Sequence, residues 1–106
     1  MVLLLPVLII LLVTAVRALA HDGMNDAWMR SLERPDVGGS CCNTTDCRVT
    51  RARVGADGWE ALNQFGVWVK VANAKIVRGK GNPTGEPVLC WLPSPGVLCF
   101  VEPPAA

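Results

Sequence analysis

The stretch 88-VLCWLPSPGVLCFV-101 decides the fold, because it holds two nearly identical apolar segments on either side of a turn. Residues 88–92 and 97–101 are rich in Val, Leu and aromatic side chains, which favour β-strands. The Pro-Ser-Pro-Gly between them contains the residues that end strands and form turns. The sequence therefore predicts an antiparallel hairpin, in which Cys90 lies opposite Cys99 if the turn is centred on its Ser-Pro pair.

Upstream of this hairpin, short alternating or apolar runs separated by turn signals predict four more strands. The expected strands are 47–54, 59–62, 65–71 and 74–77, and residues 78–87 form a Gly- and Pro-rich loop. The loop lacks the spacing of a nucleotide-binding P-loop.

A helix is expected before the strands. Met24, Trp28 and Leu32 recur at intervals of four residues, which predicts a short amphipathic helix over about 24–33 that lays Trp28 on a β core. The predicted fold is therefore mainly β, with one short N-terminal helix packed on a small antiparallel sheet or barrel-like structure.

The first 20 residues have the pattern of a secretory signal peptide, with an apolar run followed by Ala-Leu-Ala. Cleavage after Ala20 leaves a single small domain over 21–102 and a frayed tail over 103–106. We expect a periplasmic or secreted protein, with no stable membrane insertion after cleavage.

The charge balance excludes several classes of protein. Cleavage removes Arg17 and leaves basic and acidic residues in equal number and interspersed, so nothing attracts nucleic acid. The one histidine, His21, would be the new N-terminus, and the carboxylates have no spacing that forces two into a cleft. We therefore expect no enzymatic activity and no cofactor.

Five cysteines, Cys41, Cys42, Cys47, Cys90 and Cys99, fit a disulfide-stabilised exported domain. The hairpin predicts a Cys90–Cys99 bridge, and Cys47 would pair with Cys41 or Cys42. Alternatively, the two hairpin cysteines tie separately back to the cluster. Either way one thiol remains, which could link two chains in a dimer, exchange with a neighbouring disulfide or bind a metal.

A metal site is one alternative function. The α-amino group and imidazole of His21 could chelate copper or zinc, and Cys41 or Cys42 could supply a further ligand.

A binding site is a second alternative for one of the tryptophans. Trp68 lies on the face of strand 65–71 opposite its valines, so its ring could stack on a peptide or carbohydrate.

Three segments carry a resemblance to a known group of proteins: DAWMRSLERPDVGGSCCNTTDCR at 26–48, GVWVKV at 66–71 and GEPVLCWLPSPGVLCFVEPP at 85–104. They resemble an uncharacterised family of small exported proteins, mostly from alphaproteobacteria such as rhizobia. That family has a Ser-Cys-Cys-x4-Cys segment and a final Cys-Phe strand followed by prolines. The resemblance implies a periplasmic or secreted location and little about mechanism. The leading expectation is a non-enzymatic binding module for an unknown protein or envelope component.

Overall fold

The computed structural model describes residues 25–42 and 46–105, and it is mainly β with one short α-helix, as the sequence predicts. The predicted signal peptide and His21 lie outside the described residues. The elements in chain order are α2 (Asp26–Arg30), β1 (Cys47–Val49), β2 (Ala52–Gly55), β3 (Gly58–Leu62), β4 (Trp68–Lys70), the 3-10 helix η1 (Asn73–Lys75), β5 (Val88–Leu92) and β6 (Gly96–Val101). Within the described part of the chain, no helix is both long enough and apolar enough to span a membrane.

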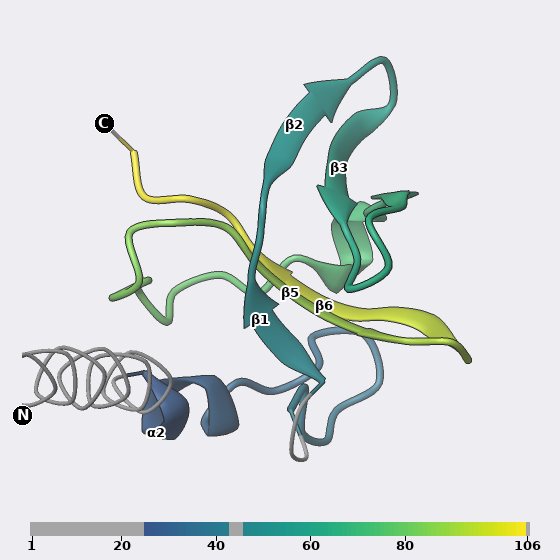
Figure 1. Ribbon diagram of the computed structural model, residues 1–106. Helices are drawn as coiled ribbons and strands as arrows, with labels where there is room; N and C mark the ends of the chain where they lie inside the picture. The colour runs from purple at the N-terminus through teal and green to yellow at the C-terminus, as the bar shows by residue number, and fades with distance from the viewer. Residues whose placement is uncertain (1–24, 43–45, 106) are drawn as a thin grey trace, which may run out of the picture.

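The strands form two antiparallel sheets of three strands each, ordered β1-β5-β6 and β2-β3-β4 (Figure 1). The expected strand 47–54 is therefore two strands, because the chain passes from one sheet to the other between Val49 and Ala52. Thr50 holds this crossing. Its N–H donates to the carbonyl of Pro87, just before β5 of the first sheet, and its hydroxyl donates to the Leu62 carbonyl of β3 in the second.

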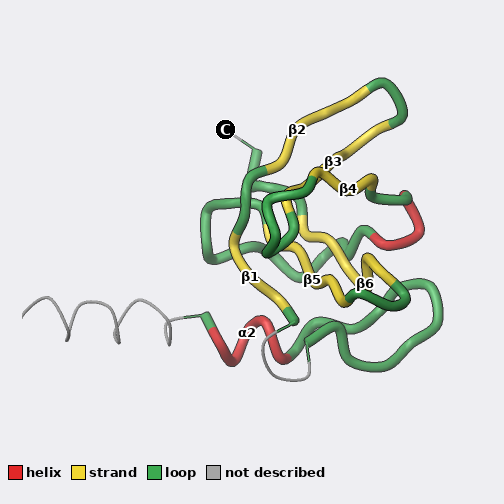
Figure 2. The backbone as a smooth tube through the Cα atoms, turned by 45° about the vertical axis from the view of Figure 1, so that its right-hand side comes forward, coloured by secondary structure: helices red, strands yellow, loops and turns green. Residues whose placement is uncertain are grey.

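Both faces of the β1-β5-β6 sheet are buried, which explains why its hairpin is apolar at almost every position. On one face, Cys90 and Cys99 pack with Leu32, and α2 adds Trp28 and Met29. On the other face, Leu89 and Phe100 pack against the second sheet through Ala61, Val71 and Ile76. The first sheet is thus a middle layer between the helical segment and the β2-β3-β4 sheet (Figure 2).

The expected strand 65–71 begins only at Trp68, and the residues before it form a turn. The Asn63 carboxamide oxygen accepts hydrogen bonds from the backbone N–H groups of Phe65 and Val67, which curls the chain. Gly66 takes a φ of 73°, which an L side chain rarely adopts. Phe65 and Val67 are consequently exposed rather than on a strand face.

The sequence predicts a strand over 74–77, but η1 occupies the first half of this segment. Only Ile76 makes a strand-like contact, an isolated parallel bridge with Phe100. The N–H of Val77 also donates to the Phe100 carbonyl, so this segment closes part of the β6 edge without forming a ladder.

Candidate functional site

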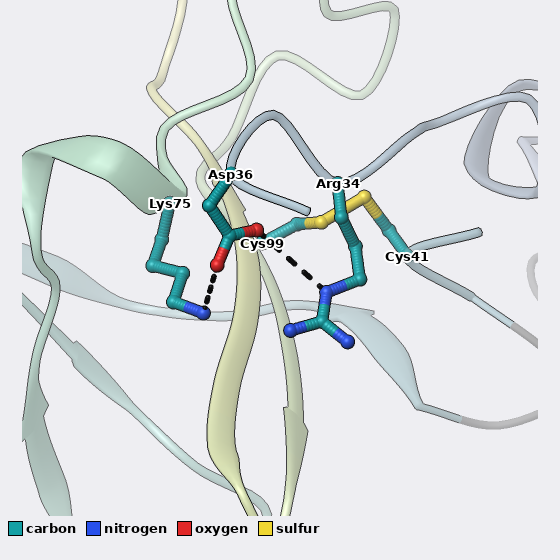
Figure 3. A network of polar contacts seen from close by, with 5 residues as sticks. All are labelled: Arg34, Asp36, Cys41, Lys75 and Cys99. Atoms are coloured by element: carbon teal, nitrogen blue, oxygen red, sulfur yellow. Dashed lines mark hydrogen bonds and ion pairs between the residues drawn. A yellow bond between two sulfur atoms is a disulfide. The ribbon is translucent and has the colours of Figure 1, made fainter. Parts of the chain in front are cut away.

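Two disulfides join the N-terminal half of the domain to the β5–β6 hairpin. Cys47 on β1 bonds to Cys90 on β5, and Cys41 bonds to Cys99 on β6 (Figure 3). The predictions of a Cys90–Cys99 bridge and of a bridge within the cluster are therefore wrong. The alternative, that the hairpin cysteines tie separately back to the cluster, is the one that the structure shows.

The physical reason is the third strand of the sheet. Cys90 does lie opposite Cys99, as the hairpin register predicts, but it also lies opposite Cys47 across the β1–β5 ladder. Strand β5 is central and has a neighbour on each side. The sulfur of Cys90 bonds to Cys47 on β1 rather than to Cys99 on β6. Cys99 is bonded instead by Cys41, which approaches the same face from the segment that follows α2.

Cys42 is the cysteine in neither disulfide, and its residue is only 5% exposed. The Ser40 hydroxyl holds the backbone here, because it accepts from the Cys42 N–H and donates to the Cys42 carbonyl. A dimer linked through the odd cysteine would therefore have to bring this buried thiol to the surface.

Of the predicted metal ligands, only Cys41 and Cys42 lie within the described residues. The sulfur of Cys41 is committed to Cys99, so it cannot serve as a thiolate ligand in this oxidised state. His21 lies outside the described residues. Across residues 25–42 and 46–105, no three His, Cys, Asp or Glu side chains are grouped closely enough to hold a metal ion.

Asp36 forms a polar link beside the Cys41–Cys99 disulfide (Figure 3). Its carboxylate accepts a hydrogen bond from the Lys75 ammonium of η1, and its other oxygen lies 3.8 Å from the Arg34 guanidinium Nε. The hydrogen bond from Lys75 lowers the pKa of Asp36, since it favours the charged form. The loop after α2 is thus held to η1 by an ion pair and to β6 by a disulfide.

The predicted binding residue, Trp68, lies half-buried on the outer face of the β2-β3-β4 sheet. The guanidinium carbon of Arg53 lies 3.9 Å from the centre of a Trp68 ring, at cation–π distance. Arg53 also donates a 2.9 Å hydrogen bond to the Glu60 carboxylate. The ring is therefore part of a cationic and aromatic surface rather than a bare stacking platform.

A shallow depression of about 230 Å³ adjoins this surface at the tip of the β2–β3 hairpin. Asp57, Glu60 and Lys70 contribute its charged lining, and Trp59 also lines it. Lys70 donates to Asp57 across it, and both side chains are three-quarters exposed. The outer sheet thus presents charges of both signs next to Trp68.

The sequence pattern did not indicate several exposed apolar side chains, among them Val54 and Phe65. Val54 is 72% exposed and Phe65 is 70% exposed, where Phe65 meets Trp91 edge-on with ring centres 5.9 Å apart. The strand pattern assigned Phe65 to a strand face, and the Asn63 turn that displaces it has a recognisable signal in Asn followed by Gly66. For Val54, the sequence does not show that the hairpin extends beyond the core.

Comparison of the chain with protein-family models, with curated proteins and with solved structures yields no match.

Proposed function

We propose that this protein is an exported, disulfide-stabilised and non-enzymatic binding module of the bacterial periplasm or extracellular space. It holds a partner protein or an envelope component against the outer face of the β2-β3-β4 sheet. The contact is centred on Arg53 and Trp68.

Export is supported by two independent features. The two disulfides join cysteines that are 58 and 43 residues apart in the sequence, and they cross-link both outer strands, β1 and β6, of the buried sheet. Such structural cross-links form and persist in oxidising compartments, whereas cytosolic thiols are kept reduced. The predicted signal peptide over residues 1–20 would direct the chain to such a compartment.

The observation that carries the binding role is the stacking of Arg53 on Trp68 at the outer surface. One face of this sheet packs on the core through Ala61 and Val69, so the side chains of the other face point outward. Trp and Arg are the residues most enriched among those that dominate binding energy at protein interfaces. The Arg53 side chain is 53% exposed, which leaves its guanidinium accessible to a partner.

Export and oxidation are tested by mass spectrometry of the mature protein recovered from outside the cytoplasm, with and without alkylation. We expect an N-terminus at His21 and four oxidised cysteines, with one cysteine modified after unfolding. Five alkylated cysteines in the recovered native protein, or an uncleaved leader, would contradict this part of the proposal.

Binding is tested by placing a photo-crosslinking amino acid at Trp68, with the same group at the exposed Lys80 as the matched control. We expect a discrete cross-linked product from position 68 in the periplasm of a bacterium that carries the gene. Arg53→Glu should suppress that product, and position 80 should not give it. Equal products from both positions, or none from position 68, would exclude this face as the binding surface.

A further inference from the structure

Strand β2 forms one edge of the β2-β3-β4 sheet, and its hydrogen-bonding pattern shows which backbone groups face outward. The Leu62 N–H donates to the Arg51 carbonyl, so Arg51 and Leu62 form a hydrogen-bonded pair. Such pairs alternate along an antiparallel ladder. Arg53 and Gly55 therefore also bond to β3, whereas the N–H and C=O groups of Ala52 and Val54 point away from it.

The other side of β3 gives an independent check of this alternation. The Val71 N–H donates to the Trp59 carbonyl, so Trp59 uses its backbone groups toward β4. Trp59 lies opposite Val54 in the ladder. Because Trp59 bonds to β4, the backbone groups of Val54 cannot bond to it and must face the open edge.

Along this edge, basic side chains alternate with apolar ones. Arg51 is exposed and forms no ion pair with any residue in the described ranges, whereas the exposed Arg53 pairs with Glu60. Val54 lies on the side of the sheet that faces the core, but it is 72% exposed because the hairpin extends beyond the core at this position. The edge thus combines outward-facing backbone groups, the positive charge of Arg51 and an uncovered apolar side chain.

We propose that the β2 edge binds an extended segment of a partner protein as an added strand, in which acidic residues alternate with apolar ones. Main-chain hydrogen bonds to Ala52 and Val54 would give affinity, and alternate side chains would give specificity. The acidic residues lie beside Arg51, and the apolar ones continue the surface of Val54. This inference rests on the proposed binding function and specifies the chemistry of the partner.

A second copy of this chain fits the edge less well. An antiparallel pairing that joins Ala52 of one copy to Val54 of the other would place the two Arg53 side chains directly opposite each other. Like charges at opposed positions destabilise a sheet. An acidic strand meets the same edge with the opposite sign of charge, which favours it as the occupant.

The test titrates the oxidised, leader-cleaved protein with the blocked peptide GEVEVEG while the backbone amides are followed by NMR. The peptide GKVKVKG, of opposite charge, is the matched control. We expect saturable shifts of the Ala52 and Val54 amides and slower hydrogen exchange at both, with GEVEVEG only. Added salt should weaken the binding, because exposed charges are screened.

Two substitutions probe the two components of the site. Val54→Pro removes the outward N–H without touching a ladder bond to β3, and it should abolish the shifts, whereas Val54→Thr should retain them. Arg51→Glu should weaken binding by about tenfold or more, whereas Lys80→Glu, the same charge change elsewhere, should have little effect. Unchanged amide patterns in β3 and β4 verify that each variant is folded.

Three results would overturn the inference: equal binding of both peptides, full binding by Val54→Pro, or concentration-dependent shifts at Ala52 and Val54 without peptide. The last would identify a second copy as the occupant. A partner cross-linked through position 68 together with an unresponsive β2 edge would overturn this inference alone and leave the proposed function intact. Absence of both signals would remove both.

Discussion

Cys90 and Cys99 lie directly opposite each other on neighbouring strands, yet each is cross-linked to a different segment of the N-terminal half. The hairpin that carries them is therefore the common anchor of the fold rather than a self-contained staple. Its register aligns the two sulfurs on one face, and β1 and the segment after α2 supply their partners.

Tryptic digestion without reduction should give one species containing residues 31–48 joined to residues 81–106. Trypsin cleaves after Arg30, Arg48 and Lys80, so the three clustered cysteines and the two hairpin cysteines fall on separate peptides. Both observed bridges connect these peptides. Local bridges would release them as two species of separate mass, which would contradict the structure. Further cleavage at Trp91 separates Cys90 from Cys99, and cleavage before Asp46 separates Cys47 from Cys41, so that each partner is identified.

Replacing Cys41 and Cys99 together by serine should destabilise the oxidised protein by about 4 kcal/mol, the loop-closure entropy for a separation of 58 residues. Replacing Cys47 and Cys90 should cost a similar amount, since 43 residues separate them and the dependence is logarithmic. Urea denaturation gives the comparison. Cys42→Ala is the matched control and should cost about 1 kcal/mol, because it removes one small buried side chain and no cross-link. An equal loss in the control would show that burial, not cross-linking, dominates.

Trp59→Phe should destabilise the fold by about 1–2 kcal/mol, because it removes a hydrogen bond to a charged acceptor. The Trp59 indole N–H donates to the Glu102 carboxylate at 2.9 Å, while its ring packs 5.5 Å from Phe100 and would be largely replaced by phenylalanine. Trp28→Phe, which removes a bond to the neutral Lys80 carbonyl, should cost about 1 kcal/mol or less. Urea midpoints measure both, and the reverse order would contradict the assigned roles.

The stability advantage of the wild type over Asp36→Asn should shrink as the pH falls below about 4. Lys75 lowers the pKa of Asp36 in the folded state, so the carboxylate stabilises the fold at every pH above its ordinary value of about 3.9. That contribution is lost as the pH falls through the lowered folded value. Thermal unfolding between pH 7 and pH 2 gives the profile. Asp57→Asn, which breaks an ion pair between two three-quarters-exposed side chains, is the matched control and should cost little stability at pH 7. A wild-type advantage that persists undiminished at pH 2 would contradict the assignment.

Local pattern was enough to predict the helix, the hairpin and the facing of Cys90 and Cys99, because each depends on neighbours in sequence. It failed where a residue could pair either with a partner near in the sequence or with one distant in the sequence. The β1–β5 ladder joins Cys47 to Cys90, and nothing near Cys47 in the sequence indicates that pairing. The predicted disulfides were wrong for this reason alone.

Two side chains that redirect the backbone account for two further differences. Thr50 bonds to both sheets and so splits an alternating run that reads as one strand. Asn63 captures two N–H groups and converts the start of the next run into a turn. Both are side-chain bonds that compete with ladder bonds, and periodicity does not register them. Trp68 could be placed on the outer face from alternation, but the Arg53 that covers its ring comes from another strand.

The long-range cross-links also set an order of events during biosynthesis. Cys41, Cys42 and Cys47 are made well before residues 90 and 99, so for that interval the only partners within reach are one another. An oxidant acting on the emerging chain would close the cluster on itself, and the native arrangement would then require reshuffling by thiol–disulfide exchange. Maturation of this small domain should therefore depend on a disulfide isomerase and not on an oxidase alone.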